Sequence, residues 1–209
     1  MNASFVVELR KRRVVAILRG LGPREAEAVA EVLLDAGFDW LEVPLNRPGA
    51  LEALACLSRS PLAAQLRLGA GTVCTTEQVQ QAVEAGARYL LSPNLNLGVL
   101  AEARRLGVPF VPGVMTPSEC FAALEAGAAA LKLFPFRALG AAGVRDLQAV
   151  LPGPFLGVGG VSTENLREVL GVCEAAGLGS LFWAPGTPLE VLRTRAAEIS
   201  AIAAQAAPP

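Results

Sequence analysis

The feature that most constrains this chain is a short pattern that recurs along it: a helix-like stretch ends in glycine, and a run of apolar residues follows. Glycine is favoured directly after a helix because it adopts a left-handed backbone there at little cost. Three of these glycines, Gly86, Gly107 and Gly127, follow one another at intervals of 21 and 20 residues. The pattern predicts repeated helix–strand units, and it occurs at residues 35–43, 84–91, 105–111 and 125–133.

The segments between these copies fit the same scheme and bring the number of strand–helix units to eight. The predicted strands are apolar on both faces, which is typical of a parallel sheet covered by helices. Eight units in 209 residues favour an α/β fold, a (β/α)₈ TIM barrel in which residues 1–209 form a single domain. A doubly wound open sheet would give the same local pattern. The strands are expected near Val14, Trp40, Arg67, Tyr89, Pro109, Ala129, Phe155 and Leu178.

Turn and capping signals place several boundaries more closely. The basic run at residues 10–13 is interpreted as a solvated flank of the first strand. We predict strands at 14–19, 67–72, 155–158 and 178–182, helix caps at Thr75 or Thr76 and at Ser162 or Thr163, and a last helix at 188–203.

The chain contains no histidine, and only Lys11 and Lys132 of its 18 basic residues are lysines. The lack of imidazole excludes Ser-His-Asp and Cys-His triads and His-ligated metal sites, and we expect no metal. A net charge of −1 without a second basic block argues against a nucleic-acid partner. No uncharged apolar run reaches the roughly 18 residues of a membrane span. The N-terminus does not resemble a signal peptide, and the four cysteines are widely spaced, so we expect a reducing, cytoplasmic location.

Three ionisable residues, Arg19, Glu42 and Lys132, fall on otherwise apolar predicted strands. The carboxyl ends of barrel strands line the active site, so these residues are candidates for its chemistry. One interpretation is an internal ion network, because buried charge is costly unless it is paired. The other is Schiff-base chemistry, because burial and a neighbouring cation favour a neutral amine that can attack a ketone. In that case Glu42 would move protons and Arg19 would bind a substrate carboxylate.

Two glycine-containing segments predict a phosphate site. Residues 158–162 follow the seventh predicted strand, and residues 177–180 follow the seventh predicted helix. Barrels often bind phosphate at the loops after strands seven and eight, where glycine lets the backbone approach the anion. A plain turn is the alternative for each segment taken alone.

Six short motifs occur along the chain: Ala16-Ile17-Leu18-Arg19-Gly20, Glu42-Val43-Pro44-Leu45-Asn46, Gly69-Ala70-Gly71-Thr72, Ser92-Pro93-Asn94, Leu131-Lys132-Leu133-Phe134-Pro135 and Val158-Gly159-Gly160-Val161. With these motifs the chain resembles the KDPG/KDPGal aldolase family, the pyruvate-forming class I aldolases of sugar-acid breakdown, from about Val14 to Ala197. The resemblance implies a (β/α)₈ homotrimer and a covalent imine on Lys132 without a metal or other cofactor. It also implies proton transfer by Glu42, phosphate binding at Gly159, Gly160, Gly179 and Ser180, and pocket positions near the pyruvate end at Thr72 and Pro93. Phe134 is expected to bind substrate as well.

Two details resemble the galactonate-type branch of that family. The gluconate-type enzymes follow the glutamate strand with Thr-Leu-Arg, whereas this chain has Pro44-Leu45-Asn46, which leaves Arg19 to hold the carboxylate. Val158 stands where the gluconate-type enzymes have threonine, near the expected position of the C4 hydroxyl. Arg47 departs from the pattern, either contacting substrate or facing solvent.

The expected reaction is therefore cleavage of 2-dehydro-3-deoxy-6-phosphogalactonate, a small-molecule substrate, to pyruvate and glyceraldehyde 3-phosphate. The alternatives within the family are 2-dehydro-3-deoxy-6-phosphogluconate and 4-hydroxy-2-oxoglutarate. Outside it, a phosphate-binding isomerase or epimerase barrel would need a pair of acid/base groups or a metal, against which the missing histidines count. A non-catalytic sugar-phosphate sensor is the remaining alternative.

Overall fold

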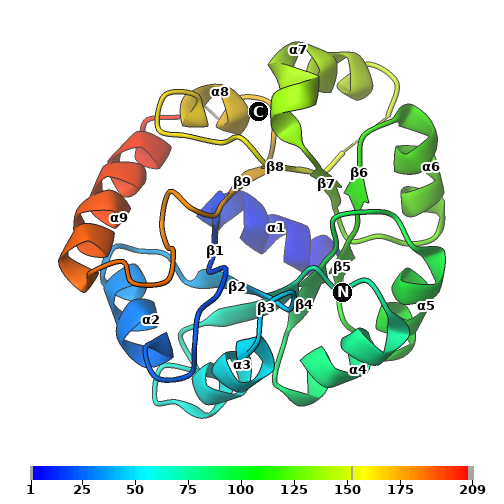
Figure 1. The fold of residues 1–209 in the computed structure, drawn as a ribbon. Helices are drawn as coiled ribbons and strands as arrows, with labels where there is room; N and C mark the ends of the chain where they lie inside the picture. Colours follow the sequence, from blue (N-terminus) through cyan, green and yellow to red (C-terminus); the bar gives the residue numbers. More distant parts are fainter. Residues whose placement is uncertain (1, 152, 207–209) are drawn as a thin grey trace.

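The computed structural model describes residues 2–151 and 153–206 and consists of parallel strands surrounded by helices (Figure 1). The strands are β1 (Val14–Ile17), β2 (Trp40–Pro44), β3 (Arg67–Gly71), β4 (Tyr89–Leu91), β5 (Phe110–Val111), β6 (Gly113–Val114), β7 (Leu131–Leu133), β8 (Phe155–Val158) and β9 (Ala175–Leu178). The helices are α1 (Asn2–Arg12), α2 (Ala26–Asp35), α3 (Ala50–Arg59), α4 (Thr76–Glu84), α5 (Leu97–Arg105), α6 (Pro117–Glu125), α7 (Phe136–Gln148), α8 (Leu166–Leu170) and α9 (Leu189–Ala204).

The sheet closes into a barrel through a strand that proline divides in two. The strand order is β5-β4-β3-β2-β1-β9-β8-β7-β6, and only Pro112 separates β5 from β6 in the chain. Proline has no N–H for the ladder, but its carbonyl accepts a hydrogen bond from the backbone of Lys132 at 2.9 Å. On the β5 side, the Phe110 carbonyl accepts one from Ala129 at 2.9 Å. The predicted eight-unit barrel is thereby confirmed, and the open doubly wound sheet is wrong.

The recurring glycine pattern is confirmed as one repeated helix ending. The glycines after α2, α4, α5 and α6 have positive φ angles between 71° and 98°. In each copy the residue after the glycine donates its backbone N–H to a carbonyl five residues earlier, as Phe38 does to Leu33 at 2.8 Å. This pattern satisfies the last carbonyls of the helix and turns the chain toward the next strand.

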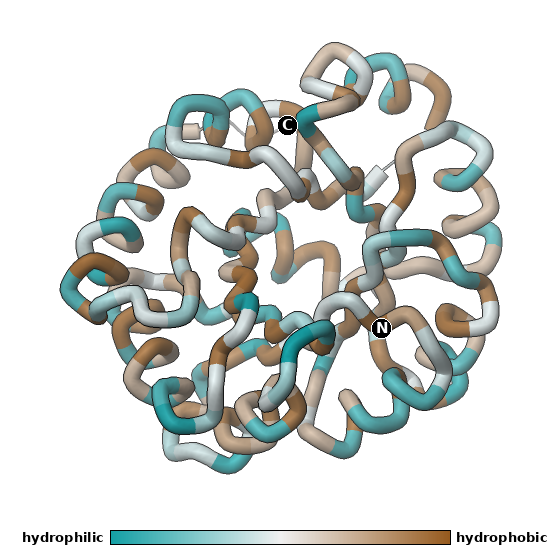
Figure 2. Tube along the Cα trace, viewed as in Figure 1, coloured by the Kyte–Doolittle hydropathy of each residue, from teal (hydrophilic) through white to brown (hydrophobic). Residues whose placement is uncertain are grey.

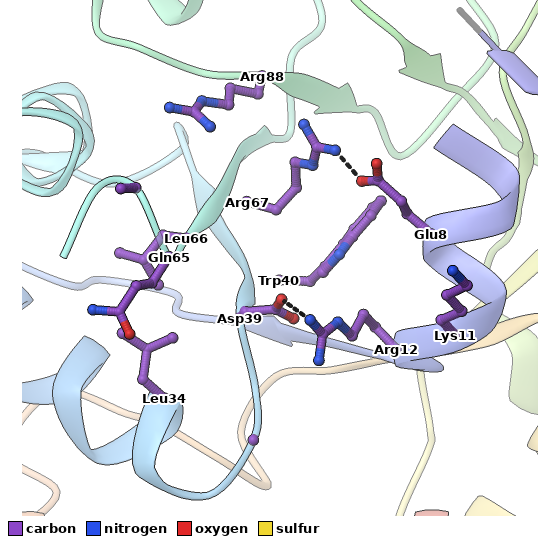
Figure 3. A pocket seen from close by; sticks show the side chains of 12 residues that line it. Glu8, Lys11, Arg12, Leu34, Asp39, Trp40, Gln65, Leu66, Arg67 and Arg88 are labelled. Atoms are coloured by element: carbon purple, nitrogen blue, oxygen red, sulfur yellow. Dashed lines mark hydrogen bonds and ion pairs between the residues drawn. The ribbon is translucent and has the colours of Figure 1, made fainter. Parts of the chain in front are cut away.

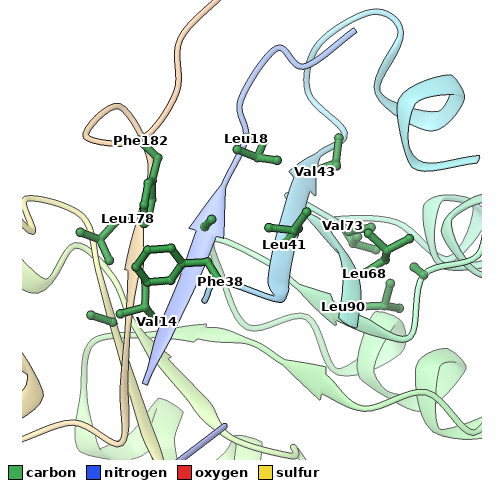
Figure 4. Close-up of a cluster of buried hydrophobic side chains, with 14 of the residues drawn as sticks. Val14, Leu18, Phe38, Leu41, Val43, Leu68, Val73, Leu90, Leu178 and Phe182 are labelled. Atoms are coloured by element: carbon green, nitrogen blue, oxygen red, sulfur yellow. The ribbon is translucent and has the colours of Figure 1, made fainter. Parts of the chain in front are cut away.

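Side chains alternate in direction along each strand, and this alternation divides the apolar residues of the strands into two cores. The larger core lies between the strands and the helices and includes Leu41, Leu68 and Leu178 (Figure 4). The smaller core fills the barrel interior and includes Val15 and Leu156. Figure 2 shows hydrophobic and hydrophilic stretches alternating around the surrounding helices, as expected for helices with one buried face. Successive side chains of a strand point to opposite faces, so the residues between outer-core positions point into the barrel.

Helix α1 seals the end of the barrel at which the strands begin (Figure 1). The Phe5 ring lies 5.2 Å from that of Trp40 and 5.9 Å from that of Tyr89, the first residues of β2 and β4. Residues 10–12 are exposed, as expected of a solvated flank before the first strand, but they form the last turn of a helix. Arg10 and Arg12 belong to α1, and they pair with Glu174 and Asp39, each at 3.0 Å.

Other boundaries were predicted with mixed success. The cap at Thr75 is confirmed: its side chain accepts the backbone N–H of Gln78, and the Gln78 side chain accepts the backbone N–H of Thr75. The last helix, predicted at 188–203, is Leu189–Ala204. Strands β1 and β3 end at Ile17 and Gly71, so Arg19 and Thr72 lie just beyond them. The cap at Ser162 or Thr163 is wrong, because Asn165 precedes α8 and accepts a hydrogen bond from the Ser162 N–H. The last strand is Ala175–Leu178, not residues 178–182.

Two general properties follow from the described residues. None of the helices in residues 2–151 and 153–206 is long and apolar enough to cross a bilayer. The four cysteines, Cys56, Cys74, Cys120 and Cys173, are free thiols.

We predict that Phe5→Ala lowers the free energy of unfolding by about 3 kcal/mol, since it empties the buried contact between α1 and the barrel. Val7→Ala on the same helix is the matched control, because that side chain is 50% exposed and its loss should cost less than about 0.5 kcal/mol. Urea unfolding followed by circular dichroism measures both values. Equal effects of the two substitutions would contradict the sealing role of α1.

Candidate active site

Glu42 and Lys132 both point into the barrel interior. Glu42 lies between the outer-core residues Leu41 and Val43 on β2, and Lys132 lies between Leu131 and Leu133 on β7. Strand alternation therefore directs both polar side chains inward. They are 1% and 5% exposed, respectively, so both functional groups are nearly removed from water.

The Glu42 carboxyl occupies space that glycine leaves open on β3. A Cβ on Gly71 would lie 1.6 Å from Glu42 Oε1, so no other residue fits there without displacing the carboxyl. The second oxygen, Oε2, is buried and has no hydrogen-bond partner among the described residues. Burial raises the pKa of Glu42, and the charges of Lys132 and Arg19 lower it in part. A carboxyl with a raised pKa and a free oxygen is suited to exchange protons near neutral pH.

The Lys132 amine is shifted toward its neutral form. Burial lowers its pKa from the ordinary value of 10.5, the Glu42 carboxylate opposes this shift, and Arg19 adds to it. The Nζ atom lies 5.1 Å from the centre of the Phe134 ring. Within the part of the chain that the structure describes, no ion pair joins Lys132, Glu42 or Arg19. The alternative of an internal network of directly paired charges is therefore wrong, although the three charges influence one another.

A cavity of about 570 Å³ lies at the carboxyl ends of the strands. Glu42 and Lys132 are not part of its wall, but the wall includes Phe134, whose ring centre lies 5.1 Å from Lys132 Nζ. This volume is within the range typical of small-molecule sites. Its wall joins the loops after β1, β2, β8 and β9 with the residue that follows β7. Among the residues expected to bind substrate, those in the wall are Arg19, Phe134, Val158, Gly159, Gly160, Gly179 and Ser180.

Both glycines after β8 are required by the local geometry. Gly159 and Gly160 have φ angles of 91° and 82°, a region that other residues rarely adopt. A Cβ on Gly160 would lie 2.6 Å from Cβ of Arg137, and one on Gly159 would lie 3.1 Å from the Phe134 ring. Bare backbone therefore forms this part of the cavity wall, as an anion site requires.

Thr72 and Pro93, which follow β3 and β4, are not part of the wall of this cavity. Thr72 follows Gly71 and has a φ angle of 57°, a strained conformation of the kind that is stored at functional sites. The backbone of Pro93 packs against Gly113, where a Cβ would approach its carbonyl to 2.3 Å. Gly113 pairs with Lys132 in the sheet, which places Pro93 near the lysine strand.

Sequence reasoning missed Trp183, which lines the cavity and is 4% exposed. Its Nε1 atom is buried and has no hydrogen-bond partner among the described residues. The apolar residues Leu181, Phe182 and Trp183 favoured a strand ending at Phe182, whereas β9 ends at Leu178. Because β9 ends earlier, Trp183 lies on the same loop as Gly179 and Ser180. The pair Gly179-Ser180 was the sequence signal that could have placed Trp183 beside the predicted phosphate site.

A second cavity, of about 660 Å³, lies at the opposite end of the barrel (Figure 3). Two ion pairs cross it, Arg67 with Glu8 and Arg12 with Asp39, and the Arg67 guanidinium stacks over Trp40 at 5.9 Å. These pairs join α1 to β2 and β3, so this cavity belongs to the closed end of the barrel. In the described residues, no three His, Cys, Asp or Glu side chains cluster in a way that could hold a metal ion.

Comparison with known proteins agrees with this geometry. A family model described as KDPG and KHG aldolase matches residues 6–187. The probable 2-dehydro-3-deoxy-6-phosphogalactonate aldolase of Rhizobium meliloti (strain 1021) is 41% identical over 189 residues, 89% of each protein. The 2-dehydro-3-deoxy-6-phosphogalactonate aldolase of Escherichia coli (strain K12) is 39% identical over 90% of this chain and 92% of its own length.

A solved structure described as native KDPGal superimposes with a TM-score of 0.88 at 38% identity. The superposition covers 92% of this chain and 95% of that one. The fold, the extent of the match and the level of identity all lead to one conclusion: the chain belongs to the KDPG and KHG aldolase family.

Proposed function

We propose that this aldolase cleaves 2-dehydro-3-deoxy-6-phosphogalactonate reversibly to pyruvate and D-glyceraldehyde 3-phosphate, through an imine on Lys132 and without a metal or other cofactor. The observation that carries this proposal is the burial of one lysine and one glutamate, Lys132 and Glu42, inside the barrel without a direct ion pair. The two relatives at 41% and 39% identity support the choice of substrate.

The chemistry begins with the neutral amine of Lys132, which attacks the C2 ketone of the substrate. Loss of water from the carbinolamine gives a protonated imine. When the C3–C4 bond breaks, its electron pair moves toward the imine and forms an enamine, while the proton of the C4 hydroxyl passes to Glu42. The enamine is then protonated at C3, and water hydrolyses the imine to release pyruvate and restore the amine.

Charge complementarity assigns the two ends of the substrate. The Arg19 guanidinium offers a planar fork that matches the C1 carboxylate, and its charge reaches both Lys132 and Glu42. The phosphate is assigned to the backbone of Gly159, Gly160 and Gly179 together with the Ser180 hydroxyl. Thr72, Pro93 and Phe134 are proposed to enclose the pyruvate portion around Lys132.

Pyruvate release from the two C4-epimeric substrates tests the substrate assignment. The wild-type enzyme should have the higher kcat/KM for the galactonate-type epimer. Val158→Thr replaces a methyl group in the cavity wall with a hydroxyl, and it should reduce this preference by roughly fivefold through a new hydrogen bond to the gluconate-type epimer. Val158→Ala is the control for lost volume. A wild-type preference for the gluconate-type epimer would establish the family alternative instead.

The pH dependence of kcat/KM tests the role of Lys132. The amine attacks only when neutral, so activity should rise with pH through its pKa, with a midpoint below 10.5 because burial lowers that pKa. Arg19 also lowers it, so Arg19→Ala should move the midpoint to higher pH in addition to raising KM. Arg24→Ala removes an exposed arginine that does not line the cavity and should leave the midpoint unchanged. A midpoint that moves equally in both variants would contradict the assignment.

We also propose that the enzyme acts as a cytoplasmic homotrimer. The family resemblance supports the assembly, and two large apolar side chains near the start of α6, Met115 and Phe121, remain exposed and could be covered by a neighbouring subunit. Light scattering should give about three times the chain mass of 21.6 kDa. A mass of one chain at micromolar concentration would contradict this proposal.

A further inference from the structure

Arg47 is a cation in the active-site cavity that the proposed reaction has not yet used. It lies on the loop after β2 and lines the same cavity as Gly159, Gly160 and Ser180. No hydrogen bond or ion pair to Arg47 occurs among the described residues. The residues of the cavity wall include Arg19 and Arg47 but no acidic side chain. The cavity is therefore positively charged, with one of its two guanidinium groups unassigned.

Trp183 supplies an independent observation that points to a ligand at the same place. An indole N–H can only donate a hydrogen bond, and a buried donor without an acceptor costs about 1–3 kcal/mol. Trp183 lies one turn beyond Gly179, to whose carbonyl its backbone N–H donates at 3.2 Å. Trp183 lines the cavity on the same loop as Gly179 and Ser180, and a substrate oxygen bound at this loop would supply the acceptor that Nε1 lacks among the described residues.

The two arginines of the cavity serve different ends of the substrate. Arg19 is close enough to the reacting groups for its charge to influence the pKa values of Lys132 and Glu42, for which burial is the larger cause. Arg47 influences neither group among the described residues. Arg47 is an exposed residue of the loop after β2, so we assign Arg19 to the carboxylate and Arg47 to the outer part of the cavity. A phosphate carries nearly two negative charges, and a guanidinium adds charge-assisted hydrogen bonds to those that the backbone donates.

We propose that Arg47 and the indole N–H of Trp183 bind the phosphate of the substrate, from the side of the cavity opposite the Gly159-Gly160 backbone. This inference rests on the proposed aldol cleavage and adds to it two residues that determine substrate specificity. The guanidinium of Arg47 donates hydrogen bonds to two phosphate oxygens. The Trp183 N–H donates one to a phosphate oxygen on the side of the loop after β9. The pair makes the enzyme select phosphorylated 2-keto-3-deoxy acids over their unphosphorylated counterparts.

Kinetics on matched substrates test the pair. Cleavage of the phosphorylated acid and of the same acid without phosphate is compared in wild type, Arg47→Ala, Arg47→Lys and Trp183→Phe. Arg47→Ala should raise KM for the phosphorylated substrate by about tenfold, because a charge-assisted contact is lost, with kcat little changed. The unphosphorylated substrate should be unaffected. Trp183→Phe, which keeps an aromatic ring, should raise the same KM severalfold, and Arg47→Lys should restore part of the loss. Arg24→Ala is the control for the loss of one exposed positive charge.

An unchanged ratio of kcat/KM between the two substrates in Arg47→Ala and Trp183→Phe would overturn the inference. Equal losses on both substrates would also overturn it, since they would place these residues away from the phosphate. Failure of the aldolase assignment is distinguishable, because wild type would then release no pyruvate from either acid.

Tryptophan fluorescence tests the contact without turnover. The chain has two tryptophans, and the other, Trp40, lies at the closed end of the barrel. Titration with inorganic phosphate should change the emission of wild type, should change it only at higher concentration in Arg47→Ala, and should leave Trp183→Phe unchanged. The same response in wild type and in Trp183→Phe would overturn the indole contact.

Discussion

The burial of one amine and one carboxyl inside a closed barrel is the constraint on which the rest of the structure depends. Removing a charged group from water costs several kcal/mol unless it is paired, yet no ion pair joins Lys132 to Glu42 among the described residues. The cost appears instead as shifted pKa values, lower for the amine and higher for the carboxyl, mainly because of burial. The first shift favours the neutral amine that imine formation requires, and the second makes the Glu42 carboxylate a stronger base for the proton of the C4 hydroxyl.

The remaining architecture keeps these two groups in place and closes the barrel interior at the end where the strands begin. Helix α1 closes this end, where Phe5, Trp40 and Tyr89 fill the interior. Glycine makes room at the open end: Gly71 admits the Glu42 carboxyl, and Gly159 and Gly160 expose backbone to the cavity. The same strand alternation that builds the apolar core thus directs the reactive groups inward.

The barrel could be predicted from the sequence because its helix endings repeat: the glycines at 37, 86, 107 and 127 each require the same left-handed turn. The charged residues Glu42 and Lys132 could be identified because they interrupt apolar strands. Helix α1 was missed because its adjacent valines are weak helix formers and its contacts with Trp40 and Tyr89 are distant in sequence. Trp183 was missed because an apolar run beyond β9 is locally indistinguishable from a strand, and only the pairing of β9 with β1 and β8 fixes where the strand ends.

The most direct test of the central claim is reduction of the enzyme with borohydride in the presence of pyruvate, followed by peptide mass mapping. The chain has only two lysines, Lys11 and Lys132, so the assignment is unambiguous when Lys11→Arg and Lys132→Met are treated in parallel. The account predicts a stable adduct on the peptide that contains Lys132, retained in Lys11→Arg and absent in Lys132→Met together with activity. An active wild-type enzyme that gives no adduct, or an adduct that persists in Lys132→Met, would contradict it.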